Sequence, residues 1–294
     1  MDRKNFLKKS LLAGLLGSIL PTTIKATEVP KSKSTYDKLM EQVGFNHLPN
    51  HKNITTMNTV FHQANTRGHA NHGWLNSYHS FSFASYHNPS RMHFGVLRVL
   101  NDDLVTGGKG FGMHPHDNME IVSIPLEGDL EHKDTIGNVT LIKAGDVQAM
   151  SAGTGIYHSE YNKNPDKEVR FLQIWIFPKE RNIEPNYTQI SLKNIEKKNT
   201  FYQILSPNKN DQGVCIHQDA WFHLGTFDQE KTNTYQIKKP GNGVYIFVLD
   251  GSAEIAGQSL AKRDGFGIWN VPSFDLKASK NSRILLMDIP MEIA

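Results

Sequence analysis

The sequence predicts an all-β protein that is built from two similar β-barrels in tandem. Short apolar segments recur at regular intervals, and turns rich in Gly, Asn and Asp separate them, which is typical of sandwiches and barrels. No segment carries the apolar spacing of a long amphipathic helix. The 294 residues are enough for about two domains, and the apolar content is enough for a sizeable core.

The first 26 residues have the organisation of an export signal. A basic start, MDRKNFLKKS, precedes the apolar run LLAGLLGSIL, which is too short to span a bilayer. The run RKNFLK resembles a twin-arginine signal in which Lys4 replaces the second arginine; an ordinary secretory signal or an uncleaved anchor are the alternatives. We therefore expect a signal peptide over residues 1–26, a linker over residues 27–58 and export to the periplasm.

Residues 59–180 predict the first barrel. Phe and Ser alternate over residues 80–83, which predicts a half-buried strand. Residues 93–100 predict another strand, closed by an Asn-Asp-Asp turn. Further strands are expected over residues 139–142, 146–150 and 170–177.

Residues 181–294 predict a second barrel that faintly repeats the first. PLEGDLE, which begins at Pro125, aligns with VLDGSAE, which begins at Val248, and GDVQAM from Gly145 has a rough echo in residues 264–269. No H-x-H pair occurs in this half. We therefore expect two similar barrels, of which only the first binds a metal.

Four side chains in the first half form a candidate metal centre. His114 and His116 are two residues apart, and so are His158 and Glu160. On a β-strand this spacing points both side chains to one face, so two neighbouring strands would aim four donors at one point. Three imidazoles and one carboxylate suit one divalent transition ion (Fe, Zn, Mn, Ni, Cu or Co) better than Ca or Mg, and they leave coordination positions open.

The other candidate residues carry less weight. A single H-x-H pair can occur by chance in a chain with 14 histidines. The prediction of a metal site therefore depends on the second pair, His158 and Glu160. Glu120 is an alternative carboxylate, either as a ligand or as a neighbour of the ligands. The single cysteine, Cys215, is expected to be a buried apolar thiol. Surface or capping roles are expected for the histidines upstream, which are His69, His72, His79, His87 and His93.

These motifs resemble the cupin family, and within it the pirin family. HPHDNME from His114 and MSAGTGIYHSEYN from Met150 are similar to pirin motifs over their full length, as are HGWLNSYHSFSFASY and GVLRVLNDD upstream. The resemblance covers residues 60–290 and implies a bicupin, two tandem jelly-roll barrels. It implies metal ligands at His114, His116, His158 and Glu160, whereas the general cupin pattern offers Glu120 as the carboxylate.

The resemblance also implies an activity. Bacterial pirin-like proteins include quercetin 2,3-dioxygenases, so we expect O2-dependent ring cleavage of a flavonol such as quercetin, with release of carbon monoxide. Glu160 would be the general base and iron the first choice of metal. An apolar lining for a small aromatic substrate is expected from the side chains near the motifs, which are Phe111, Met113, Met150, Ile156 and Tyr157.

The alternative function is a non-enzymatic metal-binding module that binds a protein partner, as the nuclear, iron-binding pirins do. The signal-like N-terminus disfavours a nuclear role. The net charge of +3 without a basic cluster disfavours nucleic acid as a partner. We also expect a monomer without a stable membrane span.

Overall fold

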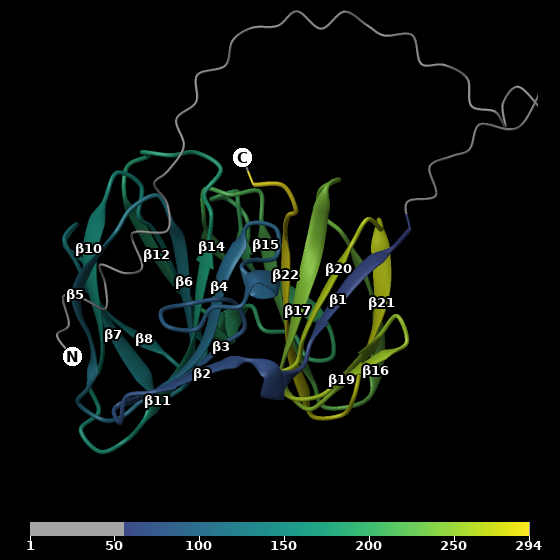
Figure 1. The fold of residues 1–294 in the computed structure, drawn as a ribbon, viewed down its shortest axis with the longest axis horizontal. Helices are drawn as coiled ribbons and strands as arrows, with labels where there is room; N and C mark the ends of the chain where they lie inside the picture. The colour runs from purple at the N-terminus through teal and green to yellow at the C-terminus, as the bar shows by residue number, and fades with distance from the viewer. Residues whose placement is uncertain (1–55, 294) are drawn as a thin grey trace, which may run out of the picture. The chain divides into compact units, whose positions relative to one another are not determined.

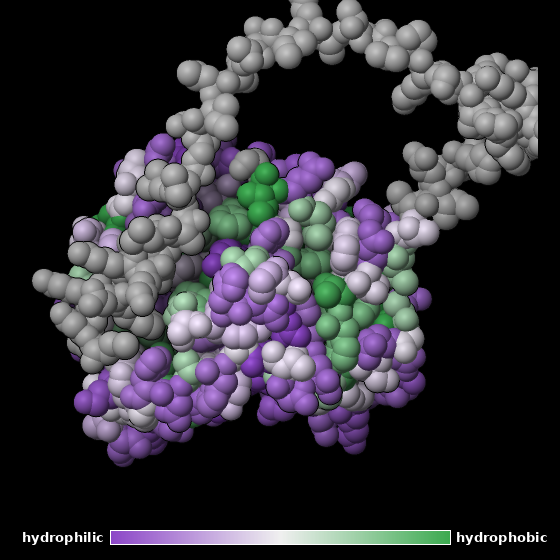
Figure 2. Space-filling model, in the orientation of Figure 1, coloured by the Kyte–Doolittle hydropathy of each residue, from purple (hydrophilic) through white to green (hydrophobic). Residues whose placement is uncertain are grey.

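The computed structural model describes residues 56–293, which form four β-sheets joined by turns and three short 3-10 helices. The predicted signal peptide (1–26) and the predicted linker up to residue 55 lie outside the described residues. No helix within residues 56–293 is long and apolar enough to cross a lipid bilayer. The face shown in Figure 2 is mostly hydrophilic, with small hydrophobic patches.

The first barrel combines a seven-stranded sheet with a four-stranded sheet (Figure 1). The larger sheet contains, in spatial order, β12 (Asn186–Ser191), β9 (Asp146–Ser151), β6 (Glu120–Glu127), β11 (Val169–Ile176), β4 (Leu97–Val105), β3 (Leu75–His79) and β2 (Gly68–Asn71). The smaller sheet contains β5 (Gly110–His116), β10 (Ile156–Asn162), β7 (Asp129–Asp134) and β8 (Val139–Lys143).

The second barrel repeats this plan with its own two sheets. The larger one contains β1 (Asn58–His62), β20 (Gly265–Trp269), β17 (Asn242–Asp250), β22 (Ser282–Pro290), β15 (Trp221–Phe227), β13 (Phe201–Ser206) and β14 (Val214–Cys215). The smaller one contains β16 (Lys231–Gln236), β21 (Ser273–Ala278), β18 (Ala253–Ile255) and β19 (Gln258–Leu260). The 3-10 helices are η1 (Ala64–Thr66), η2 (Pro89–Arg91) and η3 (Leu192–Asn194). The all-β class and the cupin architecture are thereby confirmed.

The internal repeat is also visible in the structure. The turn after β6 and the turn after β17 place Gly128 and Gly251 at φ of 74° and 73°, a left-handed conformation that glycine adopts without steric cost. The strands that follow in the alignment, β9 and β20, occupy equivalent places beside β6 and β17. The weak sequence similarity therefore marks corresponding strands of the two barrels.

Two strands do not follow the predicted boundaries between the barrels. β1 lies before the sequence of the first barrel but pairs with β20 of the second, and Figure 1 shows it beside those strands. β12 lies beyond residue 180 but pairs with β9 of the first barrel. The division into 59–180 and 181–294 stays a prediction for folding units. In the sheets, β1 belongs to the second barrel and β12 to the first.

The two larger sheets pack against each other through one apolar core. It contains Leu100, Val122 and Leu172 from the first barrel and Phe222 and Phe247 from the second, all at most 1% exposed. Burial of each such side chain contributes roughly 1.5–3 kcal/mol. The barrels are therefore held together by the same kind of core that fills a single domain.

The interiors of the two barrels differ. A single apolar cluster fills the second barrel. The first barrel has two smaller clusters, one around Phe171 and one around Met150, and buried polar side chains such as Ser123, Glu160 and Gln173 are bonded to one another in its interior. The second barrel also buries polar groups, since Tyr235 forms hydrogen bonds with His223 and Asp288, but among residues 56–293 only the first barrel gathers three or more potential metal ligands.

Strands were predicted well where alternation is strong and poorly where buried polar residues interrupt it. β8, β9 and β11 confirm the strands expected over residues 139–142, 146–150 and 170–177. The expected Asn-Asp-Asp turn was wrong, because these residues lie buried inside β4. The strand expected over residues 80–83 was also wrong, since only an isolated bridge joins Phe83 to Tyr86.

Asp102 explains why β4 continues through that polar sequence. Its carboxylate is 3% exposed and faces three guanidinium groups, those of Arg67 at 3.4 Å, Arg170 at 3.6 Å and Arg263 at 2.9 Å. Arg263 belongs to the second barrel, so the cluster ties the two barrels together. A buried carboxylate with such partners can stand inside a strand that exposed aspartates would end.

Replacing Asp102 with Asn is therefore expected to destabilise the protein strongly. The substitution leaves three partly buried cations without their counter-charge, which typically costs about 3–5 kcal/mol of the free energy of unfolding. Asp250→Asn is the matched control, because Asp250 pairs with Lys262 at the surface, where ion pairs contribute roughly 0–1 kcal/mol. Urea unfolding of both variants measures the difference; equal losses would contradict this account of the cluster.

Candidate metal centre

The imidazoles of His114, His116 and His158 lie together inside the first barrel. Their ring centroids are 4.4 Å apart for His114 and His158, and 4.9 Å apart for the other two pairs. One ligand atom from each ring lies within 4.8 Å of the others. This spacing allows one ion to contact all three rings.

Strand pairing produces this arrangement. β5 and β10 are antiparallel neighbours, and His114 lies directly opposite His158. The register shifts between His158 and Glu160, where β5 has one residue more than β10. A Cβ at Gly110 would lie 2.2 Å from the carbonyl oxygen of Glu160, so only glycine lets the two strands approach this closely.

Burial keeps the three imidazoles neutral. It lowers the pKa of His116 to about 3, and it lowers the pKa values of His114 and His158 as well. Nδ1 of His114 donates to the carbonyl oxygen of Gly112 at 2.7 Å, which leaves Nε2 with its lone pair. Neutral imidazoles with free lone pairs are the form that binds a metal.

Glu160 lies beside the histidines and is held by two donors from the larger sheet. Ser123 Oγ donates to its Oε1 at 2.9 Å, and Gln173 Nε2 donates to its Oε2 at 2.6 Å. Burial raises the pKa of Glu160 to about 7, although these two bonds oppose the shift. A carboxylate oxygen of Glu160 lies within 4.8 Å of ring nitrogens of His158 and His132. Glu160 does not belong to the group formed by His114, His116 and His158.

Glu120 does not lie in this interior. Neighbouring residues of a strand point to opposite faces, and Ile121 and Ser123 of β6 face the metal centre while Val122 packs in the core between the barrels. The carboxylate of Glu120 faces the barrel interface, where it accepts a hydrogen bond from Ser151 Oγ at 2.6 Å. The expectation that Glu120 is a ligand or a neighbour of the ligands was therefore wrong.

His132 and Asp134 were not predicted from the sequence as site residues. Both lie on β7, next to β10, and their side chains share its inner face with His158 and Glu160. His132 Nε2 lies 2.9 Å from Oδ2 of Asp134, and both side chains are buried. The H-x-D spacing in EHKD is the same alternating signal as H-x-H, and it could have identified the pair.

The expected apolar lining is correct for some residues only. Met150 and Ile156 are buried in a cluster with Trp175 and Tyr187 beside the centre. Met113 and Tyr157 are 51% and 52% exposed, because they alternate with the inward-facing ligands on β5 and β10. Phe111 packs in the cluster around Phe171. Two rings that the sequence did not indicate complete the wall, since Trp175 lies 4.9 Å from His116 and 5.4 Å from Phe83 between ring centroids.

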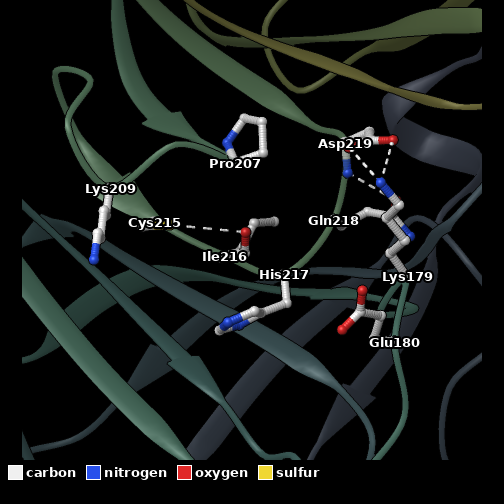
Figure 3. A pocket seen from close by; sticks show the side chains of 9 residues that line it. All are labelled: Lys179, Glu180, Pro207, Lys209, Cys215, Ile216, His217, Gln218 and Asp219. Carbon is white, nitrogen blue, oxygen red and sulfur yellow. Dashed lines mark hydrogen bonds and ion pairs between the residues drawn. The ribbon is translucent and has the colours of Figure 1, made fainter. Parts of the chain in front are cut away.

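A pocket of about 280 Å³ has His217 in its wall and is distinct from the cluster of His114, His116 and His158 (Figure 3). It is lined by Lys179 and Glu180, which follow β11, and by residues of the segment between β13 and β15. Cys215 lines it and is partly exposed rather than buried as expected. None of the four expected metal-site residues contributes to this pocket.

The residues present fit a divalent transition metal. Nδ1 and Nε2 of His158 are both buried and have no hydrogen-bond partner among residues 56–293. Buried polar atoms are normally satisfied, so a missing partner of this kind indicates a ligand. Nitrogen donors with a carboxylate nearby select Fe, Ni, Co, Zn, Mn or Cu over Ca and Mg.

Two family models match the chain. The Pirin model matches residues 60–176, and the model of the quercetinase C-terminal cupin domain matches residues 203–289. The quercetin 2,3-dioxygenase of Escherichia coli K12 is 42% identical over 228 residues, which cover 78% of this chain and 97% of the relative.

Two solved structures have a similar fold. The crystal structure of YhhW from Escherichia coli is 40% identical, with a TM-score of 0.75, and the match covers 81% of this chain and all of that one. The crystal structure of the bacterial pirin YhhW in complex with nickel(II) has the same identity and TM-score, and the match covers 80% of this chain and 100% of that one.

Replacing His158 with Ala is expected to abolish metal binding, because His158 is the donor that both groups of potential ligands share. Purified wild-type protein should carry about one ion per chain, and the variant close to none, by elemental analysis. His87→Ala, which changes an exposed histidine, is the control and should retain the metal. A folded His158→Ala protein with full metal content would contradict the assignment.

Proposed function

We propose that this chain, which belongs to the pirin family, is a metal-dependent dioxygenase that cleaves the ring of a flavonol such as quercetin with O2. The observation that carries the proposal is the cluster of His114, His116 and His158 beside the buried carboxylate of Glu160. The name of the Escherichia coli relative supports the reaction class. In this reaction both oxygen atoms of O2 enter the products and one ring carbon leaves as carbon monoxide.

The three histidines would hold the metal as neutral donors. When bound, a divalent ion supplies Lewis-acid chemistry, which lowers the pKa of a substrate hydroxyl. The hydrogen bond from His114 to Gly112 fixes one ring, and the contact with Trp175 supports His116. The ligands are thus oriented by their surroundings before substrate binds.

Glu160 would accept the proton of the substrate hydroxyl. A carboxylate in water has a pKa near 4, whereas burial raises the pKa of Glu160 to about 7 when no metal is bound, so its surroundings favour uptake of a proton. The bonds from Ser123 and Gln173 fix its orientation. We propose Glu160 both as the fourth ligand, by family pattern, and as the general base.

An apolar wall would receive the flat rings of the substrate. Trp175, Phe83 and Tyr187 lie around the histidines, as the contacts of Trp175 with His116 and of Tyr187 with His132 show. Aromatic walls of this kind bind planar substrates and exclude water.

The metal is proposed as a single divalent transition ion. Iron is the ion we propose first, and nickel(II) is the ion in the structure of the Escherichia coli relative. Both accept imidazole and carboxylate donors, and supply in the cell often decides between such ions. Elemental analysis of protein purified without added metal identifies the occupant.

Export and oligomeric state are proposed from the sequence alone. The signal-like segment of residues 1–26 supports export to the periplasm, and the expected state is a monomer. Fractionation of cells into periplasm and cytoplasm tests the first proposal. Light scattering on the purified protein tests the second.

Oxygen uptake with quercetin is the direct test of the dioxygenase. We expect uptake that stops on chelation, returns on reloading with metal and is matched by loss of the flavonol absorbance. Fully loaded protein that consumes no O2 with any flavonol would overturn the proposal and favour the metal-binding module with a protein partner.

Glu160→Gln is expected to lower the turnover number by about 10²–10⁴, the usual contribution of a general base, while metal is retained. Glu120→Gln is the matched control, because burial raises the pKa of Glu120 to about 7 as well, yet its carboxylate faces the barrel interface. The test measures the turnover number by steady-state kinetics, and the metal content, of both variants. Similar turnover in the two variants would exclude Glu160 as the base.

A further inference from the structure

His132 presents a buried nitrogen that has no partner in the described part of the chain. The ring lies on β7, directly opposite Glu160, and is 0% exposed. Its Nε2 donates to the carboxylate of Asp134 at 2.9 Å. Its Nδ1 is therefore the lone-pair nitrogen, and this atom makes no hydrogen bond.

Asp134 holds this ring in one orientation and one tautomer. Its Oδ1 accepts from the backbone N–H groups of Ile136 at 3.1 Å and Asn138 at 2.9 Å. Its Oδ2 accepts from the Asn138 side chain at 2.8 Å as well as from His132. A fixed carboxylate behind an imidazole, with the second nitrogen free, is the arrangement found behind metal-binding histidines.

His158 also has a ring nitrogen that is available to bind the ion at a second position. Both of its ring nitrogens are buried without a hydrogen bond, and an ion held with His114 and His116 would satisfy one of them. The rings of His158 and His132 are 5.4 Å apart between centroids. The donor atoms of His132, His158 and Glu160 all lie within 4.8 Å of one another.

We propose that His132, His158 and Glu160 form a second position for a divalent transition ion, which overlaps the first position at His158. Two imidazole nitrogens and one carboxylate oxygen accept the same class of ions as the first position. His158 belongs to both donor groups, so the two positions are alternatives for a single ion.

The second position is the deeper of the two. His114 and His116 are partly exposed, whereas His132, His158 and Glu160 are all buried. An ion there is further from the partly exposed side of the centre, and it keeps Glu160 as a ligand. The inference concerns metal binding alone and does not depend on the dioxygenase proposal.

Co²⁺ is the probe for the test, because its visible absorption reports the ligands around it. The metal-free full-length protein is titrated with Co²⁺ and followed by absorption and calorimetry. Wild-type protein should bind about one Co²⁺ per chain. The double variant His114→Ala/His116→Ala should still bind about one, with an affinity lowered about 10–1,000-fold, since two of the donors are lost. Adding His132→Phe to it should lower the affinity at least about 100-fold further.

His79→Phe in the same double variant is the matched control. His79 is a buried histidine of the same barrel whose Nδ1 also lacks a hydrogen bond, and its ring belongs to neither donor group. It should leave Co²⁺ binding unchanged.

Two results would overturn the proposal. One is a folded double variant, checked by circular dichroism, that binds no Co²⁺. The other is a double variant whose Co²⁺ affinity and spectrum do not respond to His132→Phe. If the double variant does not fold, His116→Ala carries the same test, because its Co²⁺ affinity should fall when His132→Phe is added, whereas adding His79→Phe should not change it.

Discussion

The antiparallel pairing of β5 with β10 is the constraint on which the metal centre depends. It places His114 opposite His158, and the alternation of each strand brings His116 and Glu160 to the same face. A slip of one residue would turn every donor to the outside, so the register has to be fixed elsewhere. β7 fixes β10 from its other edge, and the side chains of Ser123 and Gln173 hold Glu160 from the opposite sheet.

The two barrels have the same fold but different interiors. A large apolar cluster occupies the second barrel, which also contributes to the common core and supplies Arg263 to the cluster around Asp102. This support allows the first barrel to keep buried histidines and carboxylates in its own interior. Both groups of potential metal ligands found among the described residues lie there. The faint repeat and the single H-x-H pair thus have one explanation, a scaffold copy and a metal-binding copy.

Sequence reasoning succeeded where the information is local and failed where it depends on distant partners. The H-x-H and H-x-E spacings and the pirin motifs identified the cluster, because strand alternation needs only neighbouring residues. Glu120 was misplaced because its face is set by the packing of β6 against the second barrel. His132 was missed because only the pairing of β7 with β10 brings it to Glu160. The pairing of β1 with β20 likewise leaves no local signal.

The most direct test of the metal centre is anomalous diffraction from crystals of the protein as purified with its own metal. We expect one strong peak inside the first barrel, within about 2.2 Å of a ring nitrogen of His158. A peak in the pocket near Cys215, or metal-containing crystals without a peak at His158, would contradict this assignment.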